Sequence, residues 1–175
     1  YKQATDRYVE CSEKEFDFSM RSLSTVTSKD REVLIKWIAD NQATLDLVRQ
    51  GNQKPYYWQV YRTEVKDNTA MFDVLLPHLT SYRHLARLYC WQALFAAEKG
   101  DMQKAFDSVF EAYSFGQHVR GQNNTLIEQL VAMAVEGAST GTIRLLLKDH
   151  PEAIDAETSK AALERFGKLV LAESF

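Results

Sequence analysis

The chain has little of what interrupts regular structure, with seven glycines and three prolines among its 175 residues. Turn-rich all-β proteins use both residues at many of their turns, so this scarcity argues against that class and favours helices. Hydrophobic residues make up 45% of the chain and charged residues 26%, which is ordinary for a globular protein and too apolar for a disordered one. From the length we expect a single all-helical domain over residues 1–175.

Cysteine is almost absent, since Cys11 and Cys90 are the only two. Two thiols outside any CxxC pair exclude a disulfide framework and a four-thiolate zinc site. Whether these two thiols pair with each other depends on the compartment, which the sequence leaves open. Cys90 lies within a strongly apolar helical pattern, and we predict that it is a small buried hydrophobic residue.

Sequence motifs of metal-binding, catalytic and nucleotide-binding sites are also missing. The chain contains no HExxH, no histidine preceded at three positions by glutamate, no nucleophile elbow, and no glycine-rich phosphate or dinucleotide loop. Glu111 and His118 share a helix face, but a spacing of seven residues separates them by about 10 Å, too far for a direct acid–base pair. We therefore predict no metal, no cofactor and no catalytic group.

Neither charge nor hydropathy points to a nucleic acid or a membrane as the partner. The formal net charge of −3 argues against a surface that seeks phosphates. The longest apolar run, Leu130 to Val135, ends at Glu136, far short of the roughly 18 consecutive residues of a span. The chain opens at Tyr1 without methionine and stops at Phe175 within an apolar helical pattern, so we expect a processed protein or a piece of a longer one.

Apolar residues recur at helical spacing through most of the chain. Residues 52–68 break this rhythm and are expected to form a long connection. Pro77 either kinks its helix or begins a new one. Gly137 and Gly141 lie four apart in one helix, where we expect close approach of a neighbouring helix, with a break near Gly141 as the alternative. The predicted helices cover residues 1–18, 28–51, 69–99, 101–119, 125–148 and 155 onward.

The most informative stretch is residues 82–120, where two amphipathic patterns meet at Glu98-Lys99-Gly100-Asp101. A helix, a glycine stop and an immediate second helix predict an antiparallel helical hairpin. Residues 86–119 resemble a tetratricopeptide repeat. The likeness rests on the small residues Ala93, Ala105 and Ala112, which stand where that family prefers small residues. Tyr89 departs from it, because the family usually has a tryptophan at that position. The resemblance implies antiparallel hairpins that form a bundle or a short right-handed α-solenoid, and it implies a role in protein binding.

The whole chain also loosely resembles a group of uncharacterised bacterial all-helical proteins. The segments that carry this likeness are Asn41 to Leu45, Tyr82 to Leu88 and Leu126 to Val135. The likeness implies a helical bundle or short solenoid and no particular reaction.

Several residues are candidates for a recognition surface. Asn41 interrupts an apolar helix face and must find hydrogen-bond partners there; we favour a structural clamp over a ligand contact. Arg83 and Arg87 stand one turn apart and suit an anionic partner. The alternative we favour is pairing with acidic residues of a neighbouring helix, such as Asp107 or Glu111. The aromatic residues after Pro55 are expected to pack on the bundle, with recognition as the alternative. The candidate surface comprises Asn41, Tyr57, Trp58, Tyr61, Tyr82, Arg83 and Arg87.

These patterns predict a non-catalytic protein-interaction or scaffold domain with an unidentified protein or peptide partner. The alternative is a small-ligand sensor or regulatory domain with a pocket near Asn41, Trp58 and Arg83. An enzyme with an unfamiliar helical site is a third class, and it would need a pocket where two or more ionisable side chains converge. The sequence leaves the oligomeric state and the compartment open.

Overall fold

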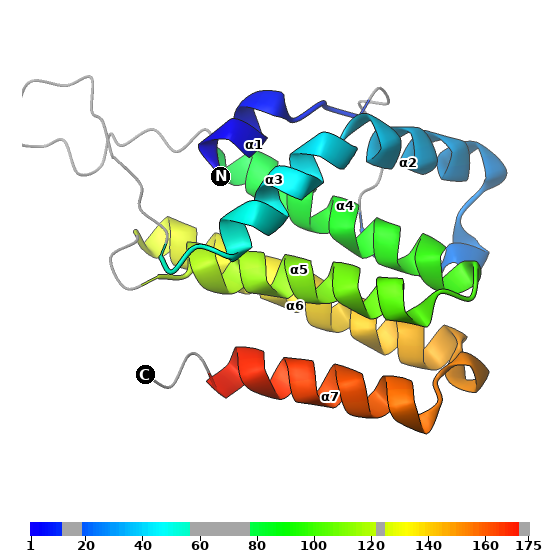
Figure 1. The fold of residues 1–175 in the computed structure, drawn as a ribbon. Coiled ribbons are helices and arrows are strands. Elements are labelled where there is room, and N and C mark those ends of the chain that lie inside the picture. The colour runs from blue at the N-terminus through cyan, green and yellow to red at the C-terminus, as the bar shows by residue number, and fades with distance from the viewer. Residues whose placement is uncertain (12–18, 57–77, 122–124, 172–175) are drawn as a thin grey trace, which may run out of the picture.

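The structure, a computed structural model, describes residues 1–11, 19–56, 78–121 and 125–171. These residues form seven α-helices and no strand, which confirms the all-helical prediction (Figure 1). Short 3₁₀ turns at Leu23–Thr25 and Pro151–Ala153 connect helices. The helices are α1 (Lys2–Arg7), α2 (Ser28–Asp40), α3 (Gln42–Asn52), α4 (His78–Glu98), α5 (Met102–Val119), α6 (Leu126–Asp149) and α7 (Ala156–Leu171).

Three long helices form the centre of the molecule. Helices α4, α5 and α6 each contact the other two. Helix α4 contributes the largest share of the core, in which its Leu85, Leu88, Tyr89 and Trp91 are fully buried. Helices α1 to α3 lie across one side of α4 and α5, whereas α7 packs on α5 from the opposite side (Figure 1).

The predicted hairpin is present, and its reversal lies at Gly100. This glycine has φ +80°, a left-handed conformation that residues with a side chain rarely adopt. The Asp101 amide donates to the Ala96 carbonyl over 3.0 Å and the Gly100 amide to the Ala97 carbonyl over 2.9 Å. These two bonds form a Schellman motif. The Asp101 side chain then accepts from the Lys104 amide and caps α5, so the chain turns within three residues.

Helix α6 begins at the predicted capping box, because Thr125 and Glu128 each accept from the other's backbone amide. The close approach expected at Gly137 and Gly141 is absent, since a Cβ built at either would meet no atom within 4 Å. The alternative break is also absent, because α6 is continuous to Asp149. The close contact lies at Gly116 of α5 instead, where a Cβ would approach the Glu136 side chain of α6 to 2.9 Å.

The helix predicted over residues 28–51 is two helices, and Asn41 lies at the junction. Its side chain bonds the backbone of Val9 and the carbonyl of Trp37. Such side-chain bonds compete with the helical pattern and allow the axis to change direction. The helix predicted over residues 1–18 ends at Arg7 within the described residues, because the Val9 backbone bonds to side chains of α2 and the junction.

Some sequence predictions lie outside the described residues: the helix start and proline kink at residues 69–77, the aromatic connection at residues 57–61, and residues 12–18. Within the described part of the chain, α6 is the one helix long and apolar enough to cross a membrane. Its most apolar stretch has a mean hydropathy of 1.4, and 28% of that stretch is buried. The expectation of no membrane span stays a prediction.

Candidate partner-binding groove

Two adjoining hollows lie between the α2–α3 layer and the α4–α5 hairpin. Their volumes are about 450 Å³ and 500 Å³, and they share Gln42, Gln92 and Lys104 as lining residues. We call the pair the groove. Its apolar end is lined by Ile35, Ile38, Ala39, Phe95, Ala96, Lys99 and Asp101, and its polar end by Arg49, Asp107, Ser108, Glu111 and Arg165.

The apolar end combines side chains from two helices that pack side by side. Ile35 of α2 is 53% exposed, whereas Phe95 and Ala96 of α4 are 7% and 6% exposed and form the floor. Ala39 is exposed and lies one turn along α2 from Ile35. A partner side chain placed here would cover Ile35, which the protein's own described residues leave largely exposed.

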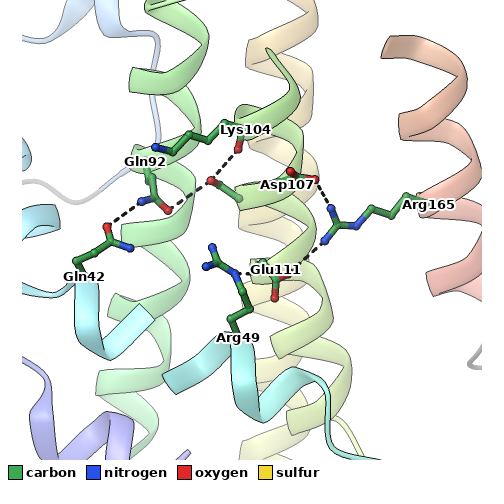
Figure 2. Close-up of a pocket in the computed structure, with 8 residues that line it drawn as sticks. Gln42, Arg49, Gln92, Lys104, Asp107, Glu111 and Arg165 are labelled. Atoms are coloured by element: carbon green, nitrogen blue, oxygen red, sulfur yellow. Dashed lines mark hydrogen bonds and ion pairs between the residues drawn. The ribbon is translucent and has the colours of Figure 1, made fainter. Parts of the chain in front are cut away.

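Uncharged polar groups connect the two ends. The Gln92 Nε2 donates to Gln42 Oε1 over 3.2 Å, joining α4 to α3. The Ser108 hydroxyl lies 2.8 Å from the Lys104 carbonyl and 3.4 Å from Gln92 Oε1. Gln42 is exposed, so its amide is accessible to a partner's backbone. Figure 2 shows the Lys104 side chain extending across this part of the groove toward Gln92.

The polar end is organised around Glu111, whose side chain is 15% exposed. One of its oxygens lies 3.2 Å from Arg165 of α7, and the other accepts from Asn52 of α3 over 2.8 Å. Arg49 of α3 approaches the same carboxylate at 3.9 Å. Arg165 also pairs with Asp107. One carboxylate on α5 thus joins α3 and α7, as Figure 2 shows for the two arginines.

Two lysines of the groove have no such partner. Within the described residues, neither Lys99 nor Lys104 forms an ion pair with a carboxylate, and both are exposed. Arg49 and Arg165, in contrast, are engaged with Asp46, Asp107 and Glu111. The free positive charge therefore lies at the apolar end, with Lys99, and where the two ends meet, with Lys104.

None of the four predicted surface residues that the structure describes lines the groove. Asn41 is fully buried, and its amide donates to the Val9 and Trp37 carbonyls and accepts from the Val9 amide, each over 2.9 Å. This is the clamp that we favoured. Tyr82 is 1% exposed and packs edge-on against Phe115; it belongs to the core and to no surface. Tyr57, Trp58 and Tyr61 lie outside the described residues.

The favoured pairing of Arg83 and Arg87 with acidic residues stays a prediction, but the two carboxylates named as examples, Asp107 and Glu111, are not the partners. Those carboxylates bind Arg165 and Arg49 instead. Arg83 is exposed on α4, and Arg87, one turn on, is half-buried. Burial lowers the pKa of the neighbouring His84, and the charges of both arginines lower it further.

The cysteines form no disulfide. Cys11 is half-buried and Cys90 is fully buried, and both thiols are free. Burial raises the pKa of Cys90 to about 11, partly opposed by hydrogen bonds from Thr142 and Ser139. This confirms Cys90 as a small buried residue. Within the described part of the chain, no three His, Cys, Asp or Glu side chains are grouped so as to hold a metal ion.

Sequence reasoning missed the residues that line the groove. Gln42, Gln92 and Lys104 come from three helices, and isolated glutamines and lysines are normal on any helix surface. One signal was present: Ile35 stands outside the apolar face formed by Leu34, Trp37 and Ile38. An isoleucine on the polar side of a helix is a weak indication of an exposed contact.

Comparison with protein-family models, curated proteins and solved structures finds no significant match to this chain. The groove and the chemistry of its residues therefore carry the functional proposal.

Proposed function

We propose that the chain is a non-catalytic interaction domain that receives an extended segment of a protein or peptide partner in the groove. The supporting observation is the groove's composition. An apolar end with a 53% exposed Ile35 continues into accessible amide groups and two lysines that pair with no carboxylate of the described residues. An apolar anchor beside hydrogen-bonding groups suits a peptide, whose backbone is polar and whose side chains alternate.

We also propose that the hairpins form a short right-handed α-solenoid of the tetratricopeptide type. The α4–α5 hairpin supports this, because α6 packs back on both of its helices. Ala93, Ala105 and Ala112 are fully buried, as small residues must be where two helices cross closely. One observation departs from a regular array: α7 packs mainly on α5, whereas a full repeat would pair it tightly with α6.

The groove predicts a selective peptide binder, which phage display of random dodecapeptides can test. Peptides enriched on the native protein are then measured against Ala39→Gln, which fills the apolar end with a neutral side chain. Ala39 is exposed on a helix, so the fold should tolerate this change. Ala43→Gln is the matched control, because Ala43 is also exposed on a helix but does not line the groove.

The expected result is enriched peptides whose affinity falls by roughly tenfold, about 1.4 kcal/mol, in Ala39→Gln and is unchanged in Ala43→Gln. Failure to enrich any peptide would count against the proposal. Peptides that bind both variants equally would place the interaction elsewhere and would contradict the groove as the site.

A small-ligand sensor is the second candidate, and the polar end favours it. Its volume of about 450 Å³ lies in the range of ligand sites, and the cationic side chains of Lys104 and Arg49 both line it (Figure 2). A thermal-shift screen of small anionic metabolites tests it, because a true ligand raises the melting temperature by mass action. The shift should disappear in Lys104→Gln and persist in Lys160→Gln, an exposed lysine on α7.

An enzyme is a weaker candidate, although five ionisable side chains line the polar end. Asp107 and Glu111 are bound by arginines that join α5 to α3 and α7, so their geometry serves helix packing. Ser108 donates to backbone and amide acceptors and has no histidine or carboxylate partner among the described residues. A nucleophile needs such a base, and the ion pairs here act as structural links.

A further inference from the structure

The second unusual surface lies on α6, on the face turned away from α4 and α5. Large apolar side chains are exposed along it: Leu126 (75%), Ile127 (56%), Leu130 (56%), Met133 (57%) and Leu147 (49%). Single exposed apolar residues are normal, whereas the largest contiguous apolar patch on a protein surface is often functional. From Leu126 to Thr140 the exposed face carries no charged side chain.

The middle of this face is built from small residues. Ala134, Gly137 and Thr140 are exposed there, and the Thr140 hydroxyl is already bonded to the Glu136 and Gly137 carbonyls of its own helix. Each interior glycine costs roughly 1 kcal/mol of helix stability relative to alanine. Nothing in the described fold requires this, because a Cβ at Gly137 or Gly141 meets no atom within 4 Å.

We propose that α6 is a dimerisation helix, which packs antiparallel against α6 of a second copy of this chain with the crossing at Gly137. The order of residue sizes selects this arrangement. In an antiparallel pair crossing at Gly137, Met133 of one copy faces Gly141 of the other, so a large side chain lies over a small residue on each side of the crossing. A parallel pair would place Leu130 against Leu130 and leave a gap between the glycines.

The arrangement also suits the two ends of the face. A two-fold crossing at Gly137 places Leu130 opposite Arg144 and Leu126 opposite Lys148, the positive residues at the C-terminal end. Long basic side chains pack their aliphatic stems on apolar groups and keep the charge in water. The interface is isologous, as in most two-fold homodimers, and antiparallel helix dipoles attract each other.

The available area sets the strength of the dimer. By helix geometry the face is about 30 Å long and about 10 Å wide, a flat footprint on the order of 300 Å² per copy. Projecting side chains enlarge it, yet it stays below the ~800 Å² that each partner buries in a standard stable interface. The dimer is therefore weak, with a dissociation constant between about 10 µM and 1 mM.

Sedimentation velocity over about 10 µM to 1 mM should show a reversible monomer–dimer equilibrium. Leu130→Gln and Gly137→Leu should weaken dimerisation by roughly tenfold or more. The matched controls on α7 are Leu163→Gln, at a 71% exposed leucine, and Gly167→Leu, at a glycine whose Cβ would also meet nothing within 4 Å. Both controls should dimerise as the native protein does.

Cysteine crosslinking tests the crossing point. In a Cys11→Ser background, Gly137→Cys should form a disulfide-linked dimer with copper–phenanthroline and oxygen as the oxidant, because this residue meets its own copy. Leu126→Cys should not crosslink, since an antiparallel pair separates the two copies of residue 126. Crosslinking at residue 126 would indicate a parallel pair and overturn the arrangement.

Two further results would overturn the proposal. One is a protein that stays monomeric at 1 mM, or whose dimer is unchanged by Leu130→Gln and Gly137→Leu. The other is flotation of the monomer with phosphatidylcholine–phosphatidylglycerol vesicles, lost in Leu130→Gln, which would assign the face to a lipid surface. The groove lies on other helices, so none of these outcomes bears on peptide binding there.

Discussion

Asn41 stabilises three backbone groups near the junction of α2 and α3. Its fully buried amide pairs with both backbone groups of Val9 and with the Trp37 carbonyl, all at 2.9 Å. The Trp37 indole donates to the same Val9 carbonyl over 3.0 Å. The segment after α1 is thus attached to the bundle through Asn41 and Trp37 at Val9, and through His84 at Tyr8.

Replacing this amide should strongly destabilise the fold. Asn41→Ala removes the side-chain partner of the Val9 amide and of the Trp37 carbonyl, whereas the Val9 carbonyl keeps the Trp37 indole. Each unpaired group costs about 1 kcal/mol or more, so we expect a loss of about 2–3 kcal/mol in the free energy of unfolding. Urea denaturation followed by circular dichroism measures it. Gln50→Ala, at an exposed position on α3, is the control and should change stability by less than about 0.5 kcal/mol.

Alanine substitutions at Gly116 and Gly167 compare a glycine in close contact with a neighbouring helix and one in open space. Alanine at either gains helix propensity, but at Gly116 the new Cβ would lie 2.9 Å from Glu136 Cγ and 3.3 Å from the Ala132 carbonyl oxygen. We expect Gly116→Ala to lower the free energy of unfolding by about 1–3 kcal/mol. Gly167→Ala, in open space, should raise it by about 0.5–1 kcal/mol. Equal effects in thermal or urea unfolding would contradict the close approach of α5 and α6.

At the scale of elements, the long helices and their ends were predictable because local chemistry determines them. Thr125 and Glu128 cap α6, and Gly100 reverses the chain. The break at Asn41 was not predictable. An asparagine within an apolar pattern is compatible with a continuous helix, and its actual partner is 32 residues away at Val9. The approach at Gly116 was missed for the same reason, because spacing alone cannot show which glycine faces a neighbouring helix.

The hairpin reversal has its own test. Gly100→Ala meets no steric obstacle, since no atom lies within 4 Å of the new Cβ. The remaining cost is the left-handed conformation at φ +80°, about 1–2 kcal/mol for a residue with a side chain. Differential scanning calorimetry should show a lower melting temperature with the fold intact. Lys99→Ala, at the preceding exposed residue, should have little effect, and an equal loss there would show that conformation is not the cause.

For the whole molecule, burial of histidines predicts a dependence of stability on pH. Burial lowers the pKa of His78 and of His84 below the usual value of 6.5, against an opposing effect of Glu128 on His78. The unfolded chain therefore binds protons at a higher pH than the folded one does. The free energy of unfolding should be constant with respect to these groups above about pH 7 and should fall as the pH drops below about 6.5.

Urea denaturation at a series of pH values measures this fall. His84→Asn is the informative variant, because an asparagine oxygen can replace Nδ1 as the partner of the Tyr8 hydroxyl, 2.9 Å away. Its stability should decline less steeply with acid than that of the native protein. Parallel curves for the two proteins would contradict the role of His84.

The groove could not have been derived from the sequence, because it belongs to the assembled molecule. Gln42, Gln92 and Lys104 come together only once α3 packs across α4 and α5. The residues with conspicuous patterns, Asn41 and Tyr82, turned out to be internal. A polar residue within an apolar stripe is therefore better evidence that the residue is buried than that it belongs to a binding surface.

Glu111 couples helices that are otherwise far apart in the chain. Arg49 on α3 and Arg165 on α7 approach the same carboxylate of α5. A shift of either helix therefore changes the charge that balances Glu111 for the other arginine. Among natural variants of this protein, positions 49, 111 and 165 should therefore change in concert, and a substitution at one should be accompanied by compensation at another.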